Sequence, residues 1–305
     1  MAFRDFPLVF DNTMLSDYRT CPKKFMWAYI RGIRPKVPAV DLHAGIAFAK
    51  GLEIARRSHF IGGLSPGRAL EEGLLAAWQA YGTFEPPPQK EHKSRLQVGR
   101  ALISYLDHYP MDTDYLKPTT IGPTNAIEFT FAVPVQLKHP QSGEDLIIAG
   151  RCDMIAKFRD SLYVVDEKTT SRLGRTWSEQ WPLRSQFRTY VWAAREFGWP
   201  AVGAIVRGIA LSKTEIRHAE AIIPIQDWMI HQWLETTYQT LKQIKESWTN
   251  NRWLPVLGDA CNSYGGCRYR SLCLKRDPEP WITTNYEEWH WNPLRPSTSE
   301  EENNL

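Results

Sequence analysis

Apolar side chains recur every three or four residues along several stretches of the first third of the chain, which is the spacing of an amphipathic helix. Pro22 follows Cys21 as a proline at the first helical position would, so a helix is expected from Pro22 to near Gly32. Ser16 is expected to cap a short turn before it. Further helices are expected over 43–59, 66–81 and 94–109, the last two ended by Gly82 and Pro110.

The pattern changes to a two-residue period near residue 126, where Ile127, Phe129 and Phe131 alternate with more polar neighbours. This alternation predicts a half-buried strand. Further strands are expected over 146–156, 161–170, 202–212 and 217–225, and helices over 179–198 and 227–248. The pattern therefore predicts an α/β chain in which three strands, a helix and another strand follow the N-terminal helices.

The composition is that of an ordinary globular protein, with 43% apolar and 23% charged residues among 305. It excludes a disordered or fibrous chain, and the length suffices to bury a sizeable core. The net charge of +3 excludes neither nucleic acid nor a neutral partner, because a local patch matters more than the total. Neither a secretory signal nor an apolar run long enough to span a membrane is evident, so a cytoplasmic protein without a membrane partner is expected.

Two aspartates and a lysine fall on neighbouring predicted strands. A hairpin that turns between Arg159 and Asp160 pairs residues whose numbers add up to 319, so Asp153 lies opposite Asp166. Their Cβ atoms would then be ~5 Å apart. The two-residue period places Lys168 on the same face of the sheet as Asp166.

Two carboxylates this close repel each other and are costly to ionise in apolar surroundings. A hard divalent cation would keep both ionised, and the Lys168 ammonium would neutralise a phosphate or orient a water. The pattern therefore indicates metal-assisted hydrolysis of a phosphodiester. The alternative is a surface hairpin with cross-strand salt bridges, but the apolar run 162–165 just before the charges favours a site.

The segment Gly150-x-x-Asp153, followed by Asp166-x-Lys168-Thr169, resembles the motif of the RecB-like branch of the PD-(D/E)XK nuclease superfamily. The resemblance implies a Mg²⁺- or Mn²⁺-dependent deoxyribonuclease in which Asp153 and Asp166 bind the metal. Lys168 would stabilise the pentavalent phosphate or position the attacking water.

Gln186 and Tyr190 are four residues apart on the next predicted helix and share one of its faces. They resemble the Q-x-x-x-Y element that supports the site and contacts DNA in this branch. The alternative is a helix that packs Phe187, Val191 and Ala194 inward, with Gln186 and Tyr190 at its rim.

The first core helix departs from the pattern of the family, which has a metal-binding histidine there. Ala49 stands where that histidine would be, and His43, six residues earlier, is expected to be structural. Glu53 keeps the position of a carboxylate that the resemblance makes a metal ligand, together with the main-chain carbonyl of Glu167. Glu128 is a weaker candidate, because it lies on the polar face of its strand.

Three cysteines lie within thirteen residues, Cys261, Cys267 and Cys273, which points to a bound metal or cluster with Cys21 as the natural fourth ligand. Cys152 lies inside a strand and is expected to be a buried thiol. The remote first cysteine, in a C-P-x-x-F context, resembles the iron–sulfur RecB-like nucleases, AddB and the CRISPR-associated RecB-like exonucleases. This resemblance implies a [4Fe-4S] cluster; a structural Zn²⁺ site is the alternative, although zinc sites usually include a more closely spaced cysteine pair.

Basic and aromatic side chains surround these cysteines in the sequence. They are Lys23, Lys24, Arg268, Tyr269, Arg270, Lys275 and Arg276. Such a mixture suits a path for single-stranded DNA, where phosphates are neutralised and bases stack. The expected partner is DNA, single-stranded or as duplex ends, with a recombination, repair or phage protein as a further partner.

The resemblance implies an α/β fold with a restriction-endonuclease-like core (αβββαβ, mixed sheet), a helical insertion and a C-terminal Fe–S segment. The expected parts are an N-terminal helical segment with the first cluster cysteine (1–40), a nuclease core (41–61 and 119–225), a helical insertion (62–118), a C-terminal helix with the Fe–S segment (226–281) and a disordered polar tail (282–305).

The expected function is a metal-dependent exonuclease that processes DNA ends in recombination, repair, phage replication or defence. A catalytically reduced nuclease fold that binds DNA or a partner protein is the alternative, because the first-helix histidine is missing. An iron–sulfur redox protein is a third reading.

Overall fold

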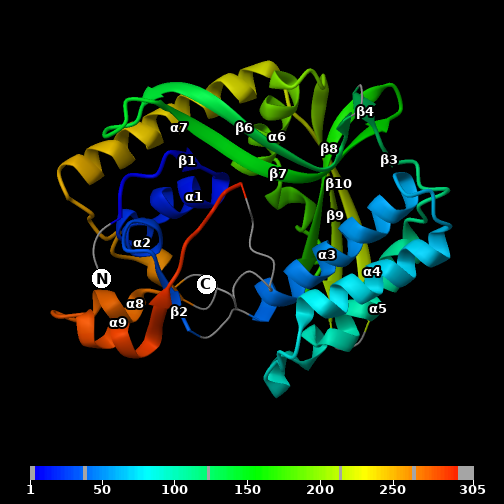
Figure 1. Cartoon of the computed structure of the whole chain (residues 1–305), viewed down its shortest axis with the longest axis horizontal. Coiled ribbons are helices and arrows are strands. Elements are labelled where there is room, and N and C mark those ends of the chain that lie inside the picture. The colour runs from blue at the N-terminus through cyan, green and yellow to red at the C-terminus, as the bar shows by residue number, and fades with distance from the viewer. Residues whose placement is uncertain (1–3, 37–39, 122–123, 213–214, 263–265, 295–305) are drawn as a thin grey trace. The chain divides into compact units, whose positions relative to one another are not determined.

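The computed structural model describes residues 4–36, 40–121, 124–212, 215–262 and 266–294 (Figure 1). These residues form two compact units. The first contains described residues from 4–36, 131–150 and 231–294, and the second contains those from 40–130 and 151–230.

The second unit is built on a mixed sheet. β7 (Asp145–Phe158) pairs antiparallel with β8 (Ser161–Thr170), β8 pairs parallel with β9 (Ala201–Leu211), and β9 pairs antiparallel with β10 (Ile216–Pro224). β3 (Lys117–Pro118) also pairs with β7, as does β6 (Ile127–Lys138), most of which belongs to the first unit. β4 (Thr120–Ile121) pairs with β5 (Thr124–Asn125). Because parallel neighbours need a crossover connection, a helix stands between β8 and β9 in the chain.

Helices pack on both faces of this sheet. α3 (Val40–Phe60), α4 (Pro66–Tyr81) and α5 (Arg95–His108) lie side by side (Figure 1), and α6 (Ser185–Glu196) is the crossover helix. Glu167 of β8 binds Arg56 of α3, whereas the adjacent Asp166 binds Gln186 of α6. Since successive side chains of a strand point to opposite faces, α3 and α6 cover opposite faces of the sheet.

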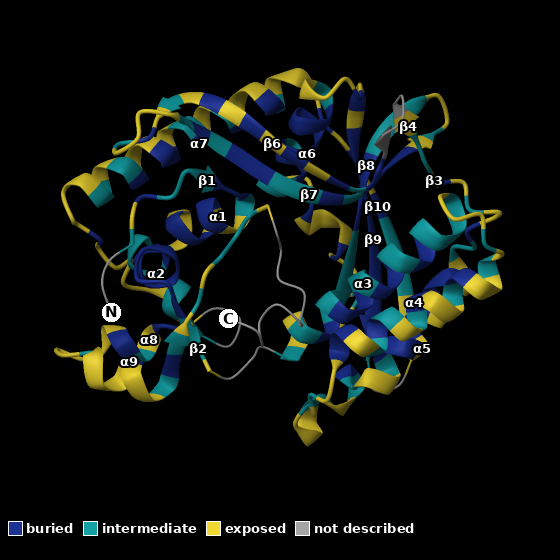
Figure 2. Cartoon of the chain, in the orientation of Figure 1, coloured by how far each residue is buried: buried dark blue, intermediate teal, exposed yellow. Residues whose placement is uncertain are grey.

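The apolar core of the second unit follows from the helical stripes. Ala44, Ala47, Phe48, Leu52 and Ala55 of α3 are buried together with residues of α4 and α5 and with Ile209 and Leu211 of β9. Nearly every residue of β9 is buried (Figure 2), as expected for a central strand covered on both faces. Two short 3₁₀ helices, Pro88–Lys93 and Ser178–Gln180, complete the unit.

The first unit combines short helices and short strands. β1 (Val9–Phe10) pairs parallel with β7, and β2 (Ile33–Pro35) pairs antiparallel with β11 (Tyr286–Glu288). Its helices are α1 (Asn12–Thr20), α2 (Pro22–Phe25) with the π-helical turn Met26–Ile30, most of α7 (Asp227–Thr249), the 3₁₀ turn Asp259–Cys261, α8 (Arg270–Cys273) and α9 (Glu279–Asn285). Within the described part of the chain, every helix is too short or too polar to cross a lipid bilayer.

The order α3, β6, β7, β8, α6, β9 confirms the predicted αβββαβ arrangement and its mixed sheet. Two local predictions are wrong. Ser16 lies inside α1, and Asp11 caps that helix by accepting a hydrogen bond of 2.8 Å from the Met14 amide. The helix expected over 179–198 begins at Ser185, because Pro182 lacks the N–H that a continuous helix would need.

The tail expected to be disordered over 282–305 is partly regular. α9 continues to Asn285, and β11 then pairs with β2 through Tyr286, Glu287 and Glu288. Tyr286 is 4% exposed and donates a hydrogen bond to the Arg268 carbonyl, so packing orders a segment whose composition is polar. Residues 295–305, the rest of this predicted tail, lie outside the described residues.

Candidate active site

The candidate site lies where β7 and β8 separate. Their paired residues run from Phe158 and Ser161 at the hairpin to Met154 and Val165, and every pair adds up to the predicted 319. Beyond that last pair β8 continues along β9, and the next residues on the two strands are Asp153 and Asp166. The two aspartates therefore stand at a fork in the sheet.

Asp153 occupies the position of the next backbone hydrogen bond. Its Oδ2 accepts a hydrogen bond of 2.7 Å from the Glu167 amide, so a side chain completes the ladder where the strands part. Burial raises the pKa of Asp153 well above its ordinary value, and the negative charges of Asp166, Glu167 and Glu128 raise it further. The Asp153 carboxylate therefore lies in an environment of other negatively charged groups.

Asp166 is 2% exposed and lies beside the Lys168 ammonium, whose Nζ is 2.5 Å from Asp166 Oδ2. Burial raises the pKa of Asp166, while Lys168 acts in the opposite direction. Burial lowers the pKa of Lys168, but the charges of Asp166 and Asp153 outweigh this and raise it overall. Lys168 is therefore a protonated cation next to two carboxylates, on the face that the two-residue period predicts.

The α6 helix adds two polar side chains to this face. Gln186 Nε2 lies 3.3 Å from Asp166 Oδ1 and 2.7 Å from the Tyr190 hydroxyl. Burial raises the pKa of Tyr190 well above its ordinary value, and the Asp166 charge adds to the effect. Gln186 therefore links Asp166 to Tyr190, while Phe187, Val191 and Ala194 are buried as the packing alternative expects.

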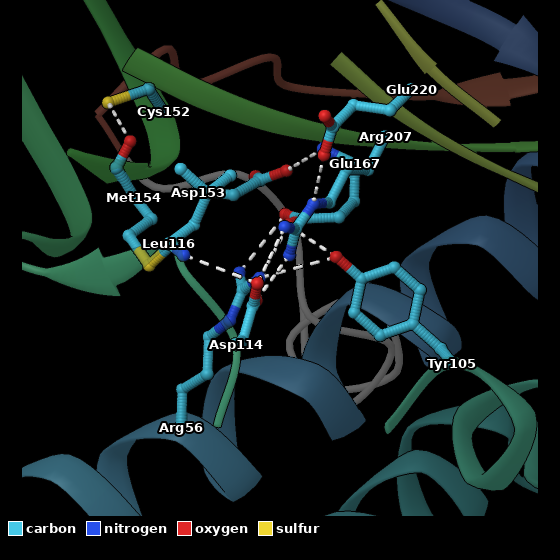
Figure 3. A network of polar contacts seen from close by, with 10 residues as sticks. All are labelled: Arg56, Tyr105, Asp114, Leu116, Cys152, Asp153, Met154, Glu167, Arg207 and Glu220. Atoms are coloured by element: carbon cyan, nitrogen blue, oxygen red, sulfur yellow. Dashed lines mark hydrogen bonds and ion pairs between the residues drawn. The ribbon is translucent and has the colours of Figure 1, made fainter. Parts of the chain in front are cut away.

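Glu167 points to the other face, where it enters a buried polar network (Figure 3). Arg56 of α3 binds both of its carboxylate oxygens, at 3.1 and 2.5 Å, and the Tyr105 hydroxyl of α5 donates to it at 2.9 Å. Burial raises the pKa of Glu167, but the charge and hydrogen bonds of Arg56, together with Asp153 and the Arg207 charge, outweigh burial and lower the pKa to about 2. Glu167 is therefore a carboxylate fully paired away from the Asp153–Asp166 face.

A second buried guanidinium continues this network. Arg207 of β9 lies opposite Glu167 in the strand register and binds Asp114 through two hydrogen bonds of 2.5 and 2.8 Å. Its Nε donates to Glu220 at 2.9 Å. Sequence reasoning missed Arg56, Tyr105 and Arg207, although each is a polar residue at a position where the apolar stripe of its helix or strand expects a core side chain.

Two further carboxylates predicted as candidates are paired with basic groups. Glu53 contacts Lys50 at 3.1 Å and Arg57 at 3.0 Å within its own helix. Glu128 binds Arg151 at 2.7 Å, and its φ of +53° turns its buried side chain away from the regular strand direction. Burial raises the pKa of Glu128 to about 7, against the lowering effect of Arg151.

The residues at the fork fit a hard divalent cation. Magnesium is commonly bound through one or two carboxylates, with waters and substrate phosphate completing its shell. Asp153 and Asp166 supply two carboxylates whose protonation is favoured by burial and mutual repulsion, and a cation would relieve both. Among the described residues, no group of three or more His, Cys, Asp or Glu side chains is arranged to hold a metal ion.

Four of the five cysteines come from separate segments of the first unit. The Val256 amide lies 3.4 Å from Cys21 Sγ, and the Val256 carbonyl lies 3.6 Å from Cys261 Sγ. Burial raises the pKa of Cys273, with further contributions from Cys21 and Cys267. All of these thiols are free, and the predicted Fe–S segment is not shown as a metal site; residues 263–265 within it lie outside the described residues.

Several smaller predictions also receive an answer. Cys152 is fully buried, as expected of a core thiol. His43 Nε2 lies 2.9 Å from the Tyr81 carbonyl and its ring packs on Tyr81, which is the expected structural role. Among the basic and aromatic residues near the cysteines, Tyr269 is 1% exposed, so its ring is not available for the predicted stacking with DNA bases, and Lys24 forms an ion pair with Asp17.

The family model of the PD-(D/E)XK nuclease superfamily matches residues 12–274, and the chain therefore belongs to this superfamily of nucleases. No curated protein matches the sequence. Among solved structures, the chain is similar to the crystal structure of SSO0001, with 14% identity, a TM-score of 0.31, and coverage of 86% of this chain and 95% of that one. It is also similar to a protein from Eubacterium rectale named "Putative exonuclease", with 12% identity, a TM-score of 0.46, and coverage of 90% and 92%.

Proposed function

We propose that this chain is a divalent-metal-dependent DNA nuclease that degrades DNA from its ends. One observation carries the proposal: at the fork between β7 and β8, the Asp153 and Asp166 carboxylates come together beside the Lys168 ammonium, in a chain of a nuclease superfamily. The motif resemblance to the RecB-like branch supports exonuclease action in recombination, repair, phage replication or defence.

The chemistry follows from the groups at the fork. A bound Mg²⁺ or Mn²⁺ would polarise a phosphoryl oxygen and lower the pKa of a water. Asp153 and Asp166 would hold it, with the Glu167 carbonyl as a further oxygen. Lys168 offsets the charge that develops on the phosphate, and Gln186 keeps Asp166 oriented through its contact with Oδ1. Glu53 is the remaining candidate from the first core helix.

Cleavage assays of site variants test this proposal. Asp166→Asn and Lys168→Met are each expected to lower the rate on linear DNA by a factor on the order of 10³, because a metal ligand or the phosphate-facing cation is lost. The matched controls are Asp160→Asn at the exposed hairpin turn and Lys157→Met on the exposed face of β7. Both controls should cut at the wild-type rate.

The substrate form decides between kinds of nuclease. Linear DNA labelled at the 5′ or the 3′ end should be shortened with Mg²⁺ or Mn²⁺, while covalently closed circles should stay intact. Cleavage of closed circles would show an endonuclease. Undiminished cleavage by the Asp166 variant would show that the active site lies elsewhere.

A second candidate is a catalytically reduced nuclease fold that binds DNA or a partner protein. It is favoured by Ala49 at the position of the family's histidine and by the pairing of Glu53 with Lys50 and Arg57. In that case wild-type protein would bind labelled DNA ends yet leave them uncut with either metal.

We also propose that Cys21, Cys261, Cys267 and Cys273 hold a structural [4Fe-4S] cluster, with Zn²⁺ as the alternative ligand. The proposal is supported by the common contact of Cys21 and Cys261 with Val256 and by the effect of the other thiols on Cys273. In the same unit the Lys275 ammonium lies over the exposed Trp281 ring, 5.1 Å from its centroid. Such a cation–ring pair suits contact with a single DNA strand.

A further inference from the structure

The side chain between the two motif residues of β8 is unusually well anchored. The Glu167 side chain is 3% exposed, accepts two hydrogen bonds from Arg56 and one from Tyr105, and has almost no contact with solvent to compensate its charge. Arg56 is itself 5% exposed, so two full charges are buried together. Burying such a pair costs free energy that an apolar pair would not, and a pair with this cost points to a role beyond packing.

The contacts of Arg56 and Tyr105 with Glu167 affect the candidate site through the main chain. The Glu167 amide donates the 2.7 Å hydrogen bond to Asp153 Oδ2, and the residues on either side of Glu167 are Asp166 and Lys168. Fixing the Glu167 side chain on one face of the sheet therefore fixes the peptide groups that orient all three functional side chains on the other face.

The ion pair of Arg56 with Glu167 also changes the charge near the candidate site. Glu167 lies next to the acidic pair and adds to the repulsion that Asp153 experiences. The Arg56 guanidinium neutralises Glu167 on its own face, so that the negative charge left for a cation is that of Asp153 and Asp166. Figure 3 shows Arg56 and Tyr105 pointing toward the Glu167 carboxylate from two different helices, so contacts from both helices hold this carboxylate.

We propose that Arg56, assisted by Tyr105, is a positioning residue of the nuclease site: by holding Glu167, it keeps the Glu167 amide on Asp153 and so sets the geometry in which Asp153 and Asp166 bind the divalent cation. This inference rests on the proposed function. Arg56 touches neither the metal nor the substrate, and it acts through Glu167.

The test compares metal affinity among variants that remain folded. Arg56→Met alone would leave the buried Glu167 carboxylate without the guanidinium that pairs with it, which is strongly destabilising. The double variant Arg56→Met with Glu167→Met replaces both charges by apolar groups of similar length and is expected to fold. Arg56→Lys keeps a positive charge but loses the two-pronged contact.

Mn²⁺ titration by calorimetry gives the readout, in parallel with cleavage as a function of Mn²⁺ concentration. The double variant is expected to bind Mn²⁺ on the order of 10- to 100-fold more weakly, as for other groups that orient metal ligands, and Arg56→Lys by a smaller factor. Cleavage by both should recover in part at high Mn²⁺ concentration. Hydrogen exchange of the Glu167 amide should become faster in the double variant, because its acceptor is no longer held in place.

Asp114→Asn is the matched control, because it weakens the Arg207 contact in the same buried network without a contact to Glu167. It is expected to lower the melting temperature while leaving Mn²⁺ affinity unchanged. Wild-type Mn²⁺ affinity in both Arg56 variants would overturn the inference and leave the proposed nuclease intact. A wild-type protein that neither binds Mn²⁺ nor cuts DNA would instead refute the proposed function and this inference with it.

Discussion

At the scale of one residue, Asp11 caps α1 although burying its carboxylate is electrostatically unfavourable. Its Oδ1 accepts from the Met14 amide and its Oδ2 accepts from the Trp291 indole at 2.9 Å, yet the side chain is almost fully buried. Burial raises the pKa of Asp11 to about 6, more than these hydrogen bonds lower it. The folded protein therefore binds a proton here more tightly than the unfolded chain does.

This shift predicts a pH-dependent stability. Between the unfolded pKa near 4 and the folded pKa near 6, the folded state holds more protons, so the free energy of unfolding falls as the pH rises through this window. The contribution of Asp11 amounts to roughly 2–3 kcal/mol. In Asp11→Asn this contribution disappears. Urea unfolding from pH 4 to 7 should show the stability of the wild type falling relative to that of Asp11→Asn as the pH rises, whereas parallel curves would contradict the assignment.

At this scale, sequence reasoning succeeded where the information is local. The pairing of Asp153 with Asp166, and the position of Lys168, follow from a two-residue period and the place of one turn. Arg56 and Tyr105 could not be placed in the same way, because their common partner Glu167 lies more than 60 residues away from either in the chain. The sequence marks Arg56 only as a charged residue on the otherwise apolar stripe of α3, which does not indicate its partner.

At the scale of elements, α3 and α4 cross with their backbones in close approach. A Cβ on Gly73 would stand 2.7 Å from the Gly51 carbonyl oxygen and 2.9 Å from the Ala55 Cβ. Gly51 is confined in the same way by the Gly73 carbonyl and Ala77. Two glycines thus allow the contact that fixes α3 next to its neighbour, and Arg56 follows Ala55 directly.

Gly73→Val is expected to lower the free energy of unfolding by about 2–3 kcal/mol, because the backbone oxygen it meets cannot move aside without separating the helices. Gly67→Ala is the control in the same helix, since nothing lies within 4 Å of its Cβ position. The control should leave stability unchanged or raise it by up to ~1 kcal/mol. Equal effects of the two substitutions on thermal and urea unfolding would contradict the close approach.

The elements themselves were largely predictable. β8 has the predicted bounds, and α4 begins and ends at the proline and glycine signals that mark it. The start of α6 was not predictable, because the apolar periodicity continues upstream of Pro182 and suggests a longer helix than the backbone allows. Polar strand β11 escaped prediction because its order comes from pairing with β2, some 250 residues earlier.

At the scale of the whole molecule, the cysteines connect distant parts of the chain within the first unit. A cluster held by Cys21 and the three C-terminal cysteines would close a loop of about 240 residues, and binding free energy would then become folding free energy. Cys267→Ser is expected to lose the brown colour and the iron, and to lower the melting temperature.

Anaerobic visible spectra with iron and zinc counts provide the measurement. Cys152→Ala is the control, because this fully buried thiol of β7 is not one of the proposed ligands and its loss should leave the metal content unchanged. A colourless wild-type protein with stoichiometric zinc would favour the alternative metal, and wild-type protein without either metal would refute a cluster.

The side chain that completes the ladder at the fork has a consequence for mutational scans. Asp153 accepts from the Glu167 amide and, in the proposed function, also binds the cation, so alanine at 153 leaves a partly buried donor unsatisfied, at about 1–3 kcal/mol, in addition to removing a charge. Asparagine keeps an acceptor and removes only the charge. In such a scan, asparagine at this position should lower activity but not protein abundance, whereas alanine should lower both. A metal ligand exposed on the surface would not show this difference in abundance.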